Sequence, residues 1–209
     1  MMPDGRLLVF AHEDEAQAFE RVPHFITGIG KVSAAVALAK LLADNPVREI
    51  IVLGTAGLID DSLDINTVYR VRRALQHDLA FNPPVAELGF EGAVSMRGAS
   101  PGKTGQQFPR QDGESLDDSK DDKTAVIATG DTFVTDDMVR QRLAEQGAGL
   151  VDMESYAFAA LASGFQVPLR IFKVPSDFAD SNTTDETWDD VVARKSQELL
   201  EFADSARLL

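Results

Sequence analysis

Two glycine-rich turns follow apolar stretches of the sequence, and glycine lets a ligand approach the backbone closely. The first turn, Thr27–Lys31 (TGIGK), has the glycines and lysine of a phosphate-binding loop but not their spacing. A P-loop requires glycine where Phe25 stands, and Ser or Thr where Val32 follows the lysine. A dinucleotide-binding fingerprint requires Gly or Ala at the sixth position, which is Ser33. The sequence therefore predicts a tight strand-to-helix turn here.

The second turn, Gly54–Gly57 (GTAG), follows the apolar stretch Ile50–Leu53. Its glycines allow a ligand to lie against the backbone, and Thr55 offers both a hydroxyl and an amide. By itself this turn indicates a place for a ligand and not its identity.

The sequence around two carboxylates, those of Glu154 and Asp177, fits either a structural or a functional role. Glu154 begins an otherwise apolar helical pattern, so it is either a charge favoured by the helix dipole or a ligand-binding group. Asp177 follows Ser176 after an apolar strand, so this pair either caps a turn or contributes to a site. The residues alone do not decide between these alternatives.

The chain has 209 residues, 44% of them hydrophobic and 26% charged, and a formal net charge of −14. This composition is typical of a globular protein with one core, so we expect one domain over residues 1–209. The negative charge argues against nucleic-acid binding, which depends on clustered Lys and Arg. Part of that charge lies in residues 112–122 (DGESLDDSKDD), which we expect to form a solvated loop.

The chain has no cysteine and three histidines, so disulfides and thiolate ligands are excluded. We expect no metal site and no cofactor, because histidine-rich ligand sets are also missing from the sequence. No stretch resembles a signal peptide or reaches the ~18 apolar residues of a membrane span. The expected location is the cytoplasm, with no membrane partner.

Strand and helix patterns alternate along the chain, which predicts an α/β fold around a mainly parallel sheet. The expected strands are Arg6–Phe10, His24–Thr27, Glu49–Leu53, Thr67–Val71, Ala125–Thr129 and Leu169–Val174. The expected helices are Val32–Leu42, Asp136–Glu145, Asp152–Ala162 and Asp185–Ala206. Residues 81–123 are rich in Gly, Pro and Ser, and predict a long irregular loop.

Five segments, in order, resemble the methylthioadenosine/adenosylhomocysteine nucleosidase branch of the nucleoside phosphorylase superfamily. They are Gly28–Ala35 (GIGKVSAA), Gly54–Leu58 (GTAGL), Gly130–Val134 (GDTFV), Val151–Ala157 (VDMESYA) and Ser176–Asp180 (SDFAD). The resemblance covers most of the chain but is poor over residues 81–123. It implies a single-domain, three-layer α/β/α fold with a twisted mixed central sheet.

The resemblance also implies a function, the hydrolysis of the N-glycosidic bond of a purine nucleoside. Asp177, beside Ser176, matches the acid that protonates the purine N7, and such an acid contributes ~10²–10⁴-fold to the rate. A carboxyl group carries that proton near neutral pH only when burial or another carboxylate raises its pKa. The other matching positions are Glu154 and Met153 at the ribose, Phe133 stacked on the base, the backbone of Val134 at the base edge, and Thr55 near the nucleophile and sugar.

The family divides into hydrolases and phosphorylases according to the nucleophile. Bacterial phosphorylases of the superfamily carry a phosphate-binding Arg just before the turn that matches Gly54, and this chain has Val52-Leu53 there. A nucleosidase activates water with a carboxylate of an N-terminal acidic cluster, here residues 13–15 (EDE). The best match to this base is Asp14, with Glu13 as the close alternative, although the cluster also fits an exposed helix start.

Two departures from the family pattern concern the nucleophile side. The chain has Lys173 where nucleosidases have an Arg four residues before the acid, which replaces a planar fork by a point charge. The segment between the acidic cluster and Gly28 is also short. The alternatives are therefore a purine nucleoside phosphorylase and a catalytically weak nucleoside-binding protein. The resemblance implies a homodimer, and it leaves the 5' substituent of the nucleoside open.

Overall fold

The computed structural model of the protein describes residues 1–79, 84–97, 123–183 and 188–209. A mixed sheet forms its centre, with nine strands in the described part. They are β1 (Arg6–Phe10), β2 (Phe25–Ile26), β3 (Glu49–Leu58), β4 (Tyr69–Gln76), β5 (Val85–Leu88), β6 (Val94–Arg97), β7 (Thr124–Thr129), β8 (Leu150–Asp152) and β9 (Leu169–Asp177). The order is β2-β1-β3-β8-β7-β4-β5-β6, and β9 pairs with both β3 and β4.

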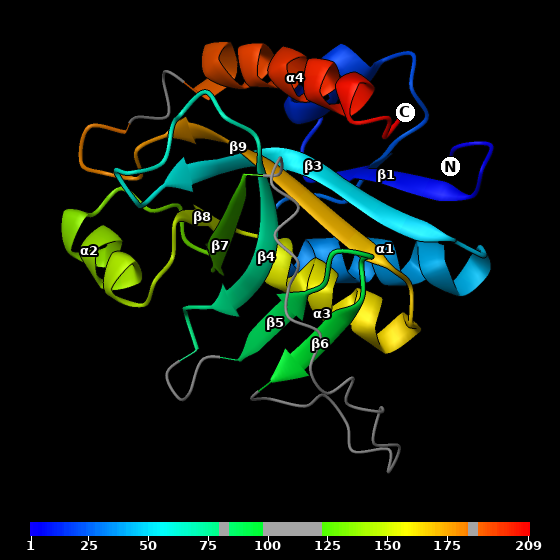
Figure 1. The fold of residues 1–209 in the computed structure, drawn as a ribbon, viewed down its shortest axis with the longest axis horizontal. Helices are drawn as coiled ribbons and strands as arrows, with labels where there is room; N and C mark the ends of the chain where they lie inside the picture. Colours follow the sequence, from blue (N-terminus) through cyan, green and yellow to red (C-terminus); the bar gives the residue numbers. More distant parts are fainter. Residues whose placement is uncertain (80–83, 98–122, 184–187) are drawn as a thin grey trace.

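Helices cover both faces of this sheet (Figure 1). On one face lie α1 (Lys31–Asp44) and α3 (Ser155–Phe165), and on the other lie α4 (Trp188–Ser205) and the short 3-10 helix η1 (Asp14–Phe19). Helix α2 (Asp137–Glu145) lies at the end of the sheet near β7 and β8. The chain thus has the expected three-layer α/β/α fold. None of the helices in the described ranges is long and apolar enough to cross a membrane.

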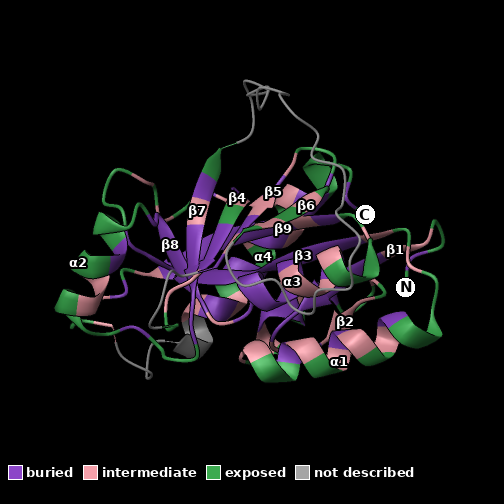
Figure 2. Cartoon of the chain, turned by 90° about the horizontal axis from the view of Figure 1, so that it is seen from below, coloured by how far each residue is buried: buried purple, intermediate pink, exposed green. Residues whose placement is uncertain are grey.

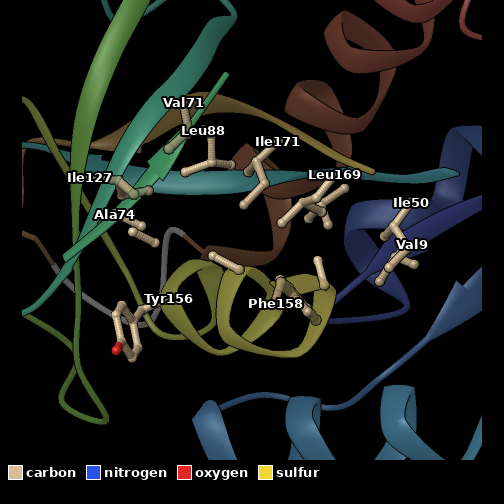
Figure 3. Close-up of a cluster of buried hydrophobic side chains, with 14 of the residues drawn as sticks. Val9, Ile50, Val71, Ala74, Leu88, Ile127, Tyr156, Phe158, Leu169 and Ile171 are labelled. Carbon is tan, nitrogen blue, oxygen red and sulfur yellow. The ribbon is translucent and has the colours of Figure 1, made fainter. Parts of the chain in front are cut away.

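The central strands β1, β3, β8 and β9 are almost entirely buried, whereas the outer sides of α1 and α2 are exposed (Figure 2). Helix α3 is nearly apolar because it packs directly on the sheet. Its Phe158 is fully buried and belongs to the same apolar cluster as Ile50 of β3 and Leu169 of β9 (Figure 3). Burial of such a side chain contributes roughly 1.5–3 kcal/mol. This cluster joins α3 to the sheet that carries the site.

Strands β3 and β9 run parallel in a register that sets the position of the site. Ile50 pairs with Leu169 at the start and Gly57 pairs with Asp177 at the end, with an irregularity between Ala56 and Gly57. The short strand β8 pairs with the end of β3 through Gly57 and Val151. The carboxyl ends of parallel strands are the usual place for ligands in such sheets. The motifs that begin at Gly54, Val151 and Ser176 therefore meet at one place.

The six strands expected from the sequence are present, most of them with different bounds, and three others were missed. Two of these, β5 and β6, form a hairpin inside residues 81–123, where a loop was expected. In β5, Ala86 and Leu88 are buried while Val85 and Glu87 are partly exposed, which is the alternation of a strand. Four residues between glycines and prolines were too short a pattern to recognise. The acidic stretch 112–122 lies outside the described residues.

The expected helix Asp152–Ala162 begins three residues later than predicted, at Ser155. Asp152 instead ends β8, where it pairs with Thr129 of β7. Its carboxylate accepts hydrogen bonds from the Ser155 amide at 3.1 Å and the Ser155 hydroxyl at 2.6 Å. Asp152 therefore belongs to the strand end and not to the helix.

Candidate active site

A small pocket of about 30 Å³ lies at the carboxyl ends of β3, β8 and β9. Four residues that the sequence analysis assigned to the base and sugar line it, namely Phe133, Val134, Met153 and Asp177. Phe133 is 39% exposed at the pocket, whereas Val134 is buried. The structure therefore brings together residues that lie far apart in the sequence.

Asp177 is held at the end of β9 by two hydrogen bonds. The hydroxyl of Ser176 donates to Oδ2 at 2.6 Å, and the amide of Ala179 donates to Oδ1 at 2.8 Å. Burial raises the pKa of Asp177 above its usual value, the two hydrogen bonds oppose this, and the nearby charge of Asp180 adds to it. Such a carboxyl group retains its proton to higher pH than an exposed one, as a general acid must.

Glu154 comes directly after the pocket residue Met153 and is only 4% exposed. Its Oε1 accepts a hydrogen bond of 2.7 Å from the amide of Gly30, at the start of α1. Burial, followed by the charge of Asp152, raises the pKa of Glu154 to about 7. The sequence analysis missed the Gly30 contact, which joins the first glycine turn to the site.

The acidic cluster at residues 13–15 directs only its third member inward. Glu15 is 4% exposed, and its Oε1 accepts hydrogen bonds from the amide of Thr55 at 2.6 Å and the hydroxyl of Thr55 at 2.8 Å. Its Oε2 accepts from the amides of Ala11 at 3.2 Å and His12 at 3.3 Å. Glu15 is thus fixed against Gly54–Gly57, which the sequence predicted as a turn but which the structure places inside strand β3.

The sequence-based choice was Asp14, with Glu13 as alternative, but Glu15 is the carboxylate of this cluster that the structure buries. The Asp14 side chain is 47% exposed and lies 3.1 Å from His12 Nδ1, while Glu13 is exposed. Helix η1 starts at Asp14 and turns Glu15, Ala16 and Phe19 toward the interior. The apolar neighbours Ala16 and Phe19 were the available signal that Glu15 shares their buried side.

Lys173 is the central cation of the site and is 1% exposed. Its Nζ lies 3.0 Å from Asp152 Oδ2. Burial alone would lower the pKa of Lys173, but the charges of Asp152, Glu15 and Glu154 outweigh burial and raise it. The ammonium group is therefore fully charged, and its neighbourhood contains three carboxylates. Sequence analysis placed Lys173 in the site but missed its partner Asp152.

Gly54 explains how Lys173 and Glu15 lie so close together. A Cβ atom at this position would lie 2.9 Å from Glu15 Oε1 and 3.0 Å from Lys173 Nζ. Both distances are below normal contact, so any side chain would push these groups away. Gly54 in strand β3 is thus required by the charged groups next to it.

Three loops around the pocket are tied together by one ion-pair cluster. Lys31 Nζ lies 2.5 Å from Asp78 Oδ2 and 3.0 Å from Asp131 Oδ2. The amide of Lys31 also donates to Asp131 Oδ1 at 2.8 Å. These contacts join the loops after β2, β4 and β7, and the last of them leads to Phe133.

Comparison with solved structures shows the same fold in two enzymes of Helicobacter pylori. Its futalosine hydrolase has a TM-score of 0.73 at 19% sequence identity, over 96% of this chain and 95% of that one. Its 5'-methylthioadenosine/S-adenosylhomocysteine nucleosidase has a TM-score of 0.74 at 18% identity, over 96% of both chains. These similarities establish the fold.

Comparison of sequences reaches the same family. The phosphorylase superfamily model matches residues 19–206. A 5'-methylthioadenosine/S-adenosylhomocysteine nucleosidase of Geobacillus sp. (strain WCH70) is 31% identical over 83% of this chain and 76% of its own length. The relative from Colwellia psychrerythraea with the same function is 29% identical over 83% of this chain and 74% of its own. The chain therefore belongs to the phosphorylase superfamily and is related to its nucleosidase members.

Proposed function

We propose that this protein hydrolyses the N-glycosidic bond of a purine nucleoside, with 5'-methylthioadenosine and S-adenosylhomocysteine as first candidates. The observation that carries this proposal is the placement of two buried carboxylates, Glu15 and Glu154, and a partly buried one, Asp177. Asp177 lies in the pocket, Glu154 follows a pocket residue, and Glu15 lies against Thr55. They provide an acid for the leaving base, a ligand for the sugar and a base for water.

Asp177 acts on the leaving base. The bond between C1' of the sugar and N9 of the purine breaks with both electrons going to the base, and N7 takes the proton of Asp177. Phe133 lies where it can stack on the purine, and the backbone of Val134 is available to its edge. The raised pKa of Asp177 supports this role, because the acid has to carry a proton before the bond breaks.

Glu154 and Met153 bind the ribose, with the Glu154 carboxylate accepting hydrogen bonds from the two sugar hydroxyls. The sugar gains positive charge as the bond to the base breaks. Buried carboxylates near this position stabilise that charge, because electrostatic interactions are strong where water is excluded.

Water is the nucleophile in this proposal. Its oxygen forms the new bond to C1' while its proton passes to Glu15, and Thr55 holds Glu15 in place. The products are the free base and the sugar with a hydroxyl at C1'. Asp177 ends without its proton and Glu15 with one more, so exchange with solvent restores both groups.

Phosphate is disfavoured as the nucleophile by the charges of the site. A phosphorylase must hold a phosphate dianion beside C1', and Lys173 is the cation nearest to the proposed base Glu15. Its charge is already matched by Asp152 at 3.0 Å, with Glu15 and Glu154 also close. Lys31 is engaged by Asp78 and Asp131. Neither lysine offers the two-pronged geometry of an arginine.

The experiment that tests this proposal measures release of free base from a panel of nucleosides. The panel contains methylthioadenosine, adenosylhomocysteine, adenosine and inosine, with futalosine added because a structural neighbour is a futalosine hydrolase. Turnover of one or more 5'-thio nucleosides supports the proposal. Tight binding of these nucleosides without any base release would instead show a nucleoside-binding protein.

Replacing Glu154 with Gln should weaken the binding of nucleosides much more than the binding of free adenine. Loss of a charge-assisted hydrogen bond costs roughly 1.5–3 kcal/mol. Free adenine has no ribose and therefore makes no such bond with Glu154. Titration calorimetry with a nucleoside and with adenine measures the difference. Equal losses for the two ligands would show that Glu154 supports the fold through Gly30 and does not bind the sugar.

The same carboxylate predicts a pH dependence with a definite sign. The pKa of Glu154 is raised from 4.5 to about 7 by folding, so folding binds a proton there. The contribution of Glu154 to the free energy of unfolding is complete below pH 4.5, the pKa in the unfolded chain, and is lost as the pH rises through about 7, the pKa in the folded protein. Thermal unfolding of the ligand-free protein should therefore show that Glu154→Gln stabilises more at pH 8 than at pH 5.

The homodimer implied by the family is also part of this proposal. Val32 and Val36 lie one turn apart on the outer side of α1, and Ile29 lies just before this helix; their exposed fractions are 72%, 57% and 48%. An exposed apolar stripe of this kind marks a surface that another protein covers. Sedimentation should show a dimer, and Val32→Glu should convert it to a monomer. A monomeric parent protein would contradict the assignment.

The cytoplasmic location likewise stays a prediction from the sequence.

A further inference from the structure

Helix α4 buries a hydroxyl among apolar residues. Val192, Ser196, Leu199 and Ala203 lie at helical spacing and are all 0% exposed. A buried hydroxyl is costly unless it is hydrogen-bonded. Ser196 therefore requires partners within the protein.

Both partners of Ser196 belong to η1, the short helix that carries Glu15. Ser196 Oγ donates to the backbone oxygen of Glu15 at 2.8 Å and accepts from the amide of Ala18 at 2.9 Å. The Ser196 hydroxyl thus donates one hydrogen bond to the backbone of η1 and accepts another from it. Around it, Ala16 and Phe19 of η1 join Leu199 and Ala203 of α4 in one apolar cluster.

The backbone of Glu15 is therefore held from one side and its carboxylate from the other. Thr55 of β3 binds the carboxylate, whereas Ser196 binds the main chain of the same residue. We propose that Ser196 is a positioning residue that sets the place of Glu15 relative to Thr55 and the sugar. This inference rests on the proposed role of Glu15 as the base that activates water.

The effect of losing this bond falls on turnover. Ser196→Ala leaves the Ala18 amide and the Glu15 oxygen without their partner, so η1 shifts and the carboxylate with it. Misplacement of a reacting group by about 1 Å can cost as much as ~10²-fold in rate. We expect kcat for base release to fall about tenfold, with KM and adenine affinity changed less than about twofold, because the groups that bind base and ribose are elsewhere.

Lys195 offers a matched control in the same helix. It is also 0% exposed, but its Nζ donates to the Ile65 oxygen at 2.9 Å and binds Glu198 at 2.9 Å. Lys195→Met removes a buried polar group that does not touch η1. It should lower the melting temperature and leave kcat unchanged, whereas Ser196→Ala lowers kcat. Ser196→Cys keeps a side chain of similar size with a weak hydrogen-bond donor, so its kcat should lie between those of the parent protein and Ser196→Ala.

A double-mutant cycle with Glu15→Gln completes the test, because a residue that acts through Glu15 has little further effect once Glu15 is replaced. The inference is overturned if Ser196→Ala keeps full turnover, if its loss persists undiminished in the Glu15→Gln background, or if neither Ser196 variant folds, which would make the residue structural. If the parent protein releases no base from any nucleoside, the proposed function itself has failed. The two failures are thus distinguishable.

Discussion

Replacing Glu15 with Gln is expected to lower kcat for adenine release by at least ~10²-fold, the low end of the contribution of a general base. An amide cannot take the proton of the attacking water. The Gln oxygen can still accept the short hydrogen bonds from the amide and hydroxyl of Thr55, and only the longer ones from the amides of Ala11 and His12, at 3.2 and 3.3 Å, are lost. The fold and the affinity for free adenine should therefore be retained, and calorimetry with adenine checks this.

Asp14→Asn is the matched control for that variant. Asp14 is the adjacent carboxylate, but its side chain is 47% exposed and lies beside His12. Its replacement should leave kcat within about twofold of the parent protein. A larger loss from Asp14→Asn than from Glu15→Gln would restore the assignment made from the sequence and remove Glu15 from the mechanism.

Asp177→Asn should lower turnover by at least ~10²-fold while nucleoside binding is largely retained. Asn can still accept the hydrogen bond from the Ala179 amide that now ends on Oδ1, so the loop keeps its shape. It cannot transfer a proton to the leaving base. Isothermal titration beside a base-release assay separates binding from turnover.

The pH dependence of the parent enzyme provides a second measure of Asp177. Burial raises its pKa, and the protonated form is the active one, so the rate should fall as the pH rises through that pKa. Asp177→Asn should lack this decrease. Asp61→Asn, at a carboxylate whose side chain is 80% exposed, is the control and should retain full activity. Full activity in Asp177→Asn would remove this residue from the mechanism.

The fold could be predicted where the sequence carries long apolar patterns. The apolar stretch Ile50–Leu53 identified β3. The glycines after it predicted a turn, but pairing with β9 continues the strand through Gly54–Gly57, and Thr55 lies inside this strand beside Glu15. The apolar pattern after Glu154 identified α3, although not its first residue. Such signals depend on local sequence, so they are readable without knowing the tertiary structure.

The contacts that complete the site could not be predicted because they depend on tertiary packing. Which of three consecutive acids points inward is decided by the 3-10 turn of η1 and by Ser196, which lies 181 positions farther along the chain. Asp152 resembled the start of a helix, but pairing with Thr129 makes it a strand end. Its ion pair with Lys173 joins two strands and leaves no local pattern.

The central claim is that water, activated by a buried carboxylate, is the acceptor of the sugar. The most direct test is release of adenine from methylthioadenosine with and without millimolar phosphate, together with identification of the sugar product. The carboxylates around Lys173 oppose the binding of a phosphate dianion, so phosphate should not accelerate release, and the product should be the free methylthio sugar. Accumulation of a sugar 1-phosphate, or a rate that depends on phosphate, would contradict the account and make Lys173 the first candidate for a phosphate ligand.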